Sequence, residues 1–140
     1  MARAYWLVKS EPEAYAWSEL VAEKTTLWTG VRNHTAKNHL IAMKKGDLVL
    51  YYHSGSGKEV VGVAKVTAEA KPDPTAQKGD PWVAPEIGAV KAFASPVSLA
   101  AVKADPKLSE IALVKLSRLS VMPLPKGAFE RILSKGKTKL

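Results

Sequence analysis

The sequence has 140 residues, of which 46% are hydrophobic and 24% are charged, a composition typical of a single globular domain with its own core. Its apolar runs are shorter than the roughly 20 residues that a membrane span requires, and the absence of cysteine excludes disulfides, thiolate metal sites and cysteine nucleophiles. Lysine and arginine outnumber aspartate and glutamate by 21 to 13, and the net charge of +8 favours a polyanionic partner, first of all nucleic acid. The same surplus can instead serve only to oppose self-association.

The start of the chain has too short an apolar stretch for a secretion signal and leads directly into a strand. We therefore expect a cytoplasmic protein without a membrane partner, acting as a monomer. His34 and His39 are five residues apart and lie on different faces of a helix, with no carboxylate at ligand spacing. We expect neither a metal nor another cofactor.

Five segments have the hydrophobic content of β-strands, and glycines or prolines separate them. The expected strands are residues 4–9, 48–53, 60–66, 86–94 and 112–121. The first two are almost continuously apolar, which is typical of strands covered on both faces. Residues 55–58 predict a hairpin turn, and Gly62 predicts a bulge or a close approach of two backbones. A long proline-containing crossing over residues 71–85 is of the kind that is commonly functional or mobile.

Three or four short helices are expected between and after these strands. Ser18 and Ser98 can each cap one of them, and residues 35–43 repeat apolar side chains at spacings of four and three. The apolar face of a closing helix begins at Phe129, and that helix stops at Gly136. This order of elements indicates an α+β protein with a curled, partly closed sheet, in one domain over residues 1–135 followed by a basic tail.

Residues 26–39 combine a large aromatic side chain and a flexible glycine with a series of polar side chains. A buried element rarely has this mixture, because an unpaired buried polar group costs about 1–3 kcal/mol. A helix that begins near residue 35 also directs free N–H groups towards this loop, which suits a phosphate or an electron-rich base edge. We interpret the segment as the wall of a ligand pocket.

Six short motifs occur in an order that resembles the EVE domain family. They are YWLVKSEP at 5–12, Trp28 followed by GVRN at 30–33, MKKGD at 43–47, YHS at 52–54, PDPT at 72–75 and SRLSV at 117–121. The resemblance implies a PUA-like fold, a mixed and largely antiparallel β pseudo-barrel with surrounding short helices, related to the YTH domains that read methylated adenine in RNA. It also implies a non-enzymatic module that holds a modified base, chiefly a modified cytosine in DNA, in a pocket. Leu116 stands where the family usually has a polar residue, commonly Gln.

Reading one base in a duplex requires flipping it out, which costs a few kcal/mol, and stacking on an aromatic ring returns about 1–3 kcal/mol. Trp28 is the expected platform, with Tyr52 or Trp17 as a second wall, although an aromatic beside a helix cap usually packs in the core. The predicted base-binding residues are Trp28, Asn33, Ser10, Lys9, Tyr52, His53, Ser54 and Trp17, and the predicted phosphate or rim residues are Arg32, Lys37 and Arg118. Asn33 can instead stabilise its own loop, and each cation can be a solvated surface charge.

Two other classes of function are also compatible with the sequence. PUA-like relatives include hydrolases, so hydrolysis of modified nucleosides or RNA is one alternative, and reading a modification in RNA is a variant of the reader. Ser54 follows His53 directly, which is not the spatial arrangement of a nucleophile and its base, and Glu11 and Glu13 flank a proline and are expected to face water. A protein-interaction module that uses the crossing and the tail is the other alternative.

Overall fold

The computed structural model of the chain describes residues 3–55 and 57–140. Its elements, in chain order, are β1 (Tyr5–Ser10), α1 (Trp17–Glu23), β2 (Thr25–Leu27), α2 (His34–Ala42), β3 (Leu48–His53), β4 (Glu59–Pro72), β5 (Val83–Ser98), α3 (Leu99–Lys103), η1 (Pro106–Leu108), α4 (Ala112–Lys115), β6 (Val121–Leu124) and α5 (Lys126–Lys135). The strands form one sheet in the order β2-β5-β4-β3-β1-β6. β1 and β3 pair in parallel, and the other pairs of the described residues are antiparallel.

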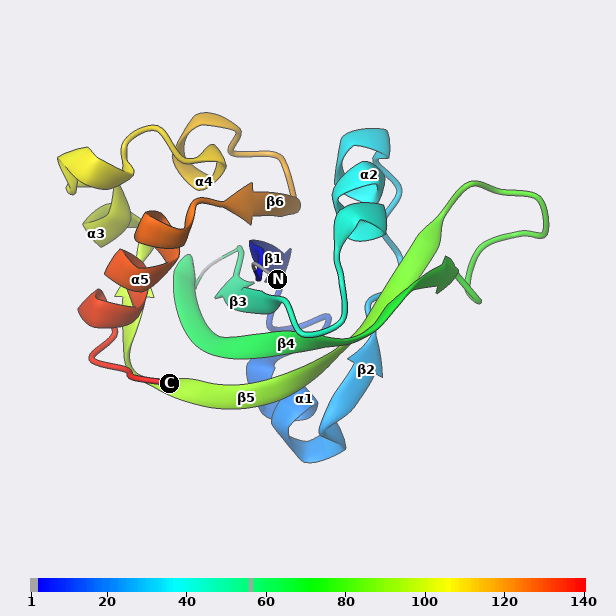
Figure 1. Ribbon diagram of the computed structural model, residues 1–140, viewed down its shortest axis with the longest axis horizontal. Coiled ribbons are helices and arrows are strands. Elements are labelled where there is room, and N and C mark those ends of the chain that lie inside the picture. The colour runs from blue at the N-terminus through cyan, green and yellow to red at the C-terminus, as the bar shows by residue number, and fades with distance from the viewer. Residues whose placement is uncertain (1–2, 56) are drawn as a thin grey trace.

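The sheet is strongly curled, and Figure 1 shows the bend in the long strands β4 and β5. Register shifts along these two strands produce the bend, because an extra residue on one strand increases its local twist. One shift lies at Gly62, where a Cβ atom would come within 2.5 Å of the Trp17 ring. Helix α2 contacts both β6, which is the last strand of the order, and β5, which is the second strand from the other end. The predicted α+β fold with a curled, partly closed and largely antiparallel sheet is confirmed.

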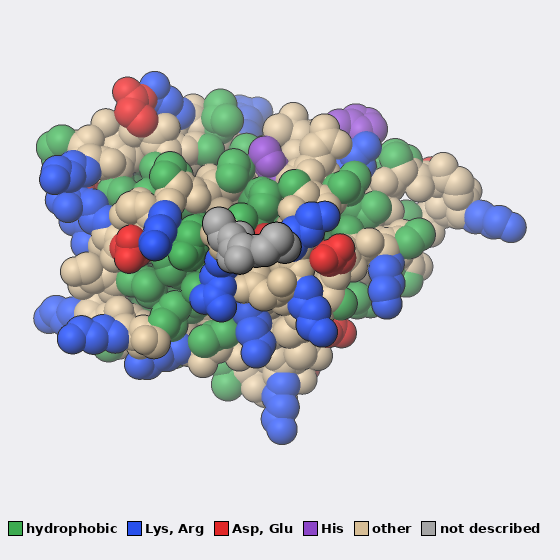
Figure 2. Space-filling view, in the orientation of Figure 1, with side chains coloured by type: hydrophobic (Ala, Val, Ile, Leu, Met, Phe, Trp, Pro, Cys, Tyr) green, Lys and Arg blue, Asp and Glu red, His purple; other side chains and the backbone are tan. Residues whose placement is uncertain are grey.

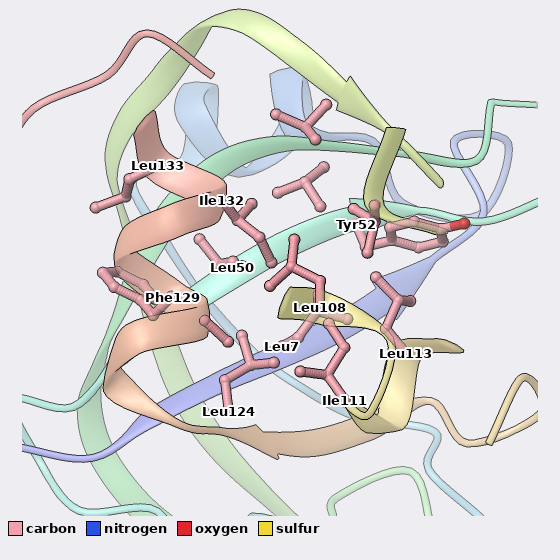
Figure 3. Packing of buried hydrophobic residues seen from close by; sticks show 14 of the residues in the cluster. Leu7, Leu50, Tyr52, Leu108, Ile111, Leu113, Leu124, Phe129, Ile132 and Leu133 are labelled. Atoms are coloured by element: carbon pink, nitrogen blue, oxygen red, sulfur yellow. The ribbon is translucent and has the colours of Figure 1, made fainter. Parts of the chain in front are cut away.

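Two hydrophobic clusters cover the two faces of the sheet. The helical cluster lies between the sheet and α3, η1, α4 and α5, and Figure 3 shows its mainly aliphatic packing around Leu50. The aromatic cluster contains Trp6, Trp17, Trp28 and Tyr51 together with apolar side chains of α1 and α2. Alternate residues of a strand point to opposite faces, so β1 and β3 contribute to both clusters. These two strands are therefore covered on both faces, as their composition predicts.

The prediction of a strand over residues 112–121 is wrong. This segment forms helix α4, a turn and the beginning of the short strand β6. Leu113, Leu119 and Val121 are at even spacings, which suits one face of a strand. Leu113 and Leu116 are three apart, which suits a helical turn, and the amide of Lys115 donates to the carbonyl of Ile111 at 3.1 Å. Periodicity over so short an apolar run does not distinguish the two structures.

Two boundaries also differ from the prediction. Helix α1 begins at Trp17 with Ala16 at the N-cap instead of Ser18, because the Glu19 carboxylate accepts a hydrogen bond from the Ala16 amide at 2.6 Å. The crossing between β4 and β5 shortens to residues 73–82, since both strands extend further than their apolar content indicates.

Ser56, in the predicted turn at 55–58, lies outside the described residues, and the flanking strands β3 and β4 pair antiparallel. In the tail, Thr138 is 6% exposed, and its hydroxyl accepts from the Ala94 amide and donates to the Gly136 carbonyl. The tail thus packs along β5. Over residues 3–55 and 57–140, no helix is long and apolar enough to cross a membrane.

Candidate functional site

A cleft of about 490 Å³ opens where strand β1 ends, and it is named the Trp28 cleft here. Its walls come from Lys9 and Ser10 of β1, residues 14–15 ahead of α1, residues 26–32 in β2 and the following loop, and Ser120 ahead of β6. These segments meet because β1 and β6 are neighbours in the sheet, and the Lys9 amide donates to the Ser120 carbonyl at 2.9 Å. The lining mixes aromatic and aliphatic side chains with hydroxyl groups and two cations.

Trp28 is 8% exposed and is one of the residues that line the cleft. Its amide donates to the Pro85 carbonyl at 2.8 Å, which ties the loop to β5. The Tyr51 ring lies 5.5 Å from the indole at an interplanar angle of 84°, and the Tyr15 ring lies 6.3 Å away at 79°. Both rings therefore meet the indole edge to face, and neither is stacked parallel on it.

Tyr51 packs against Trp28 in the aromatic cluster. Its hydroxyl donates to the Tyr15 carbonyl at 2.6 Å, which connects β3 to the segment ahead of α1. Burial raises the pKa of the Tyr51 phenol, so the group stays a neutral hydrogen-bond donor at physiological pH. The result is a wall in which three aromatic rings hold one another in fixed orientations.

Asp73 anchors the loop that follows Trp28. Its buried carboxylate accepts hydrogen bonds from the Gly30 amide at 2.8 Å and from the Arg32 guanidinium at 3.0 Å, and also from the amide and hydroxyl of Thr75. Burial alone would raise the pKa of Asp73, but the hydrogen bonds from Thr75, Gly30 and Arg32 outweigh it and lower the pKa to about 2. The Arg32 guanidinium also lies 5.8 Å from the Trp82 ring centroid. The crossing between β4 and β5 thus positions the loop that carries Trp28.

The structure brings four of the predicted site residues together in this cleft. They are Trp28, Ser10, Lys9 and Arg32. Lys9 is half-buried, its ammonium group donates to the Ser117 carbonyl at 2.9 Å, and burial lowers its pKa. Arg32 lies at the rim of the cleft, where its guanidinium forms an ion pair with the Asp73 carboxylate.

The other predicted residues lie elsewhere. Asn33 caps α2, with its side-chain oxygen accepting from the Ala36 amide at 2.9 Å. Trp17 packs against Tyr51 in the aromatic cluster, and its amide donates to Nε2 of His53 at 3.0 Å. The remaining residues are placed as follows: Tyr52 and Ser54 line a neighbouring cleft, Arg118 lines a third one, and Lys37 lies half-buried on α2.

Three residues of the site were not predicted from the sequence. Tyr15 and Ser120 line the Trp28 cleft, and Asp73 holds its wall. Asp73 lies in the PDPT motif at 72–75, so the motif was a signal for this residue although its contact was not foreseeable. Leu116 is 54% exposed and lines the third cleft with Asn33 and Arg118, away from Trp28.

The fold and the motifs agree with a comparison against known families. A model of the EVE domain matches residues 4–135. The chain belongs to the EVE domain family. This EVE domain is 34% identical to thymocyte nuclear protein 1 of Rattus norvegicus over 93% of this chain and 72% of that protein. It is 30% identical to thymocyte nuclear protein 1 of Homo sapiens over 94% of this chain and 73% of that protein. The cytoplasmic location and the monomeric state stay predictions.

Solved structures give the same assignment. A protein of Rhodopseudomonas palustris solved by NMR is 49% identical, with a TM-score of 0.90 over 96% of this EVE domain and 93% of that chain. The crystal structure of human THYN1 in complex with DNA containing 5-methylcytosine is 28% identical, with a TM-score of 0.86 over 98% of this chain and 99% of that chain. A YTH domain of Zygosaccharomyces rouxii, 14% identical with a TM-score of 0.63 over 99% of this chain and 88% of that chain, shares the fold. The predicted relationship to YTH domains is confirmed at the level of the fold.

Proposed function

We propose that this EVE domain is a non-enzymatic reader that binds DNA and holds one modified cytosine, flipped out of the duplex, in the Trp28 cleft. The observation that carries the proposal is the cleft itself, in which an indole, strand-end hydroxyl groups and two cations share one hollow of about 490 Å³. That volume falls in the range of small-molecule sites. The complex of human THYN1 with DNA containing 5-methylcytosine supports the choice of DNA and of cytosine.

The energetics of such binding are consistent with the cleft. Extracting a base costs a few kcal/mol, and stacking it on an aromatic ring returns about 1–3 kcal/mol. Leu27 and Val31 add aliphatic surface to the lining, and burying a methyl group there is worth about 0.8 kcal/mol. A methylated base is thus favoured over an unmodified one by a small free-energy difference. Stacking on Trp28 supplies the larger part of the binding free energy of either base.

Polar groups of the cleft can check the identity of the base. The hydroxyls of Ser10 and Ser120 each donate and accept, which matches the mixed donor and acceptor edge of cytosine. Lys9 and Arg32 line the same cleft, and their positive charges suit a contact with a phosphate. Figure 2 shows that Lys and Arg side chains outnumber acidic ones on the face in view, in keeping with the net charge of +8. That surplus favours association with a polyanion.

The test compares Trp28→Ala and Trp28→Phe with the parent. Binding is measured at one stated salt concentration to duplexes that carry 5-methylcytosine, 5-hydroxymethylcytosine or cytosine at one position. Trp28→Ala is expected to lose about 5- to 150-fold in affinity for the preferred duplex, equivalent to 1–3 kcal/mol of stacking, and to lose the preference for it. Trp28→Phe keeps a ring and is expected to retain part of both.

Equal affinity of the parent protein for modified and unmodified duplexes would count against the reader. Incubation with modified nucleosides and oligonucleotides tests the hydrolase alternative, since turnover would support an enzyme and saturable binding without product would support the reader. A protein pull-down that survives Trp28→Ala would support an interaction module.

A further inference from the structure

A second cleft, of about 300 Å³, lies beside the Trp28 cleft and shares Lys9 with it. The charged side chains that line it are all lysines, and we name it the lysine cleft. Its lining also includes three residues with hydroxyl groups and two leucines. The lysines are Lys9, Lys58 and Lys103, the hydroxyl residues are Tyr52, Ser54 and Ser117, and the leucines are Leu99 and Leu113.

Tyr52 contributes a hydroxyl group to the lysine cleft. The residue is 3% exposed, and its ring lies at the end of the helical cluster, where Figure 3 shows the hydroxyl pointing away from Leu50. Within residues 3–55 and 57–140 this hydroxyl makes no hydrogen bond. Burial raises the pKa of the phenol, so it remains a donor. Among the described residues no buried side-chain nitrogen or oxygen lacks a hydrogen-bond partner, so the Tyr52 hydroxyl reaches solvent and is available to donate to a group bound in the cleft.

Lys9 lies against the same ring. Its ammonium group is 5.6 Å from the Tyr52 ring centroid and donates to the Ser117 carbonyl. An ammonium group has three N–H donors, so this bond leaves donors for a ligand. Since Lys9 lines both clefts, a group bound in the lysine cleft would lie next to a base in the Trp28 cleft.

The other two lysines are held in place by one junction of the fold. Lys58 precedes β4 and Lys103 ends α3, and the Leu99 amide at the start of α3 donates to the Lys58 carbonyl at 2.8 Å. The acidic residue nearest to Lys58 in the sequence is Glu59. Glu59 lies opposite His53 in the register of β3 and β4, and it does not line the cleft. The arrangement thus concentrates hydrogen-bond donors and positive charge at one place.

We propose that the lysine cleft binds a backbone phosphate adjacent to the modified base, so that base and phosphate are recognised together. This inference rests on the proposed function of the Trp28 cleft. A phosphate offers several acceptor oxygens and a negative charge, which match ammonium and hydroxyl donors and form charge-assisted hydrogen bonds. Lysine supplies a point charge without fixed geometry, so this contact adds affinity and registers the strand without reading sequence.

The experiment uses the full chain and a duplex with one 5-methylcytosine, in which the phosphates around that base are replaced one at a time by uncharged methylphosphonate. At one position, the replacement is expected to weaken binding to the parent protein at least fivefold. The same replacement is expected to have no further effect on the double variant Lys58→Gln, Lys103→Gln. The slope of log affinity against log salt is also expected to become shallower by about 1 in the double variant.

The matched control is Lys45→Gln, Lys78→Gln, which removes the same charge from two exposed lysines outside both clefts. Equal losses in the two double variants, or the same methylphosphonate penalty in parent and Lys58→Gln, Lys103→Gln protein, would overturn the inference. Its failure is separable from failure of the reader, because the reader is tested by the base preference of Trp28→Ala. A preference lost in Trp28→Ala but unchanged in Lys58→Gln, Lys103→Gln, together with a penalty at one phosphate, is the supporting result.

Discussion

The two faces of the sheet are built from different side chains and do different things. The helical cluster consists mostly of leucine, valine and isoleucine and is covered by α3, α4 and α5. The aromatic cluster contains three tryptophans, and one of its members, Trp28, also lines a cleft. Aromatic rings carry a polar handle, as where Nε1 of Trp6 donates to Asp47 at 3.0 Å. Rigid rings with polar anchors can border an open cleft, whereas flexible aliphatic side chains fill their space.

The largest expected effect on stability comes from breaking the helical cluster. Leu50 is fully buried in it, and Leu50→Ala is expected to lower the free energy of unfolding by about 2–5 kcal/mol, because it removes contacts and leaves a cavity. The folded fraction should keep its base preference, since Leu50 does not line the Trp28 cleft. Urea unfolding and duplex binding check the two parts. A loss of less than 1 kcal/mol in unfolding free energy, or a changed base preference, would contradict the proposed difference between the two faces of the sheet.

Asp73→Asn sharpens the comparison by loosening only the wall of the Trp28 cleft. The variant removes the charge that accepts from Gly30 and Arg32, and it is expected to cost about 1–3 kcal/mol in unfolding free energy. Because the folded protein lowers the pKa of Asp73 from 3.8 to about 2, the unfolded state binds more protons as the pH falls below about 4. This part of the stability is present above pH 4 and is lost towards pH 2.

Urea unfolding at a series of pH values checks the Asp73 prediction. The parent protein is expected to lose more stability than Asp73→Asn between pH 4 and pH 2. An identical acid dependence in the two proteins would mean that the carboxylate is not paired in solution.

His53 provides a weaker, pH-dependent test of the aromatic face. Its Nε2 accepts from the Trp17 amide and must be unprotonated, and burial lowers the pKa of His53. As the pH falls below about 6.5 the unfolded state protonates first, so stability decreases, by at most about 1.4 kcal/mol per pH unit for one proton. In His53→Leu this decrease in stability is expected to be smaller than in the parent. A part of it remains because burial also lowers the pKa of His39. Urea unfolding across this pH range is the measurement, and an equal decrease in the parent and in His53→Leu would contradict the prediction.

The smallest effect is expected from Leu116→Gln, which restores the residue type that is usual in the family. Leu116 is 54% exposed and does not line the Trp28 cleft, so unfolding free energy should change by no more than about 0.5 kcal/mol and base preference should stay the same. Competition binding with modified and unmodified duplexes is the measurement. A change in preference above fivefold would show that Leu116 reaches the base.

Much of the fold could be predicted from local patterns. The apolar runs of β1 and β3 and the periodic faces of α2 and α5 lie where they were expected, because such patterns reflect which side of an element is buried. The segment at 112–121 could not be assigned in this way. A spacing of three between leucines fits a helix, and only the packing of α4 against β6 selects that structure.

The candidate site was predictable in part. Trp28, Ser10, Lys9 and Arg32 belong to motifs that the sequence marks, and they line one cleft. The partner of Arg32 was not predictable, because Asp73 is 41 residues away along the chain and meets it only across the curled sheet. Asn33 illustrates the opposite error, since the same amide that suits a base edge also caps a helix.

By itself the sequence determined the family, the strands with two covered faces and the positive charge, because motif order, apolar periodicity and composition are properties of the chain alone. The tertiary structure decided that Trp28 borders a cleft beside Tyr15, that Asp73 holds its wall and that three lysines line one cleft with Tyr52. These neighbours come from distant segments, and how close they lie depends on how far the sheet curls.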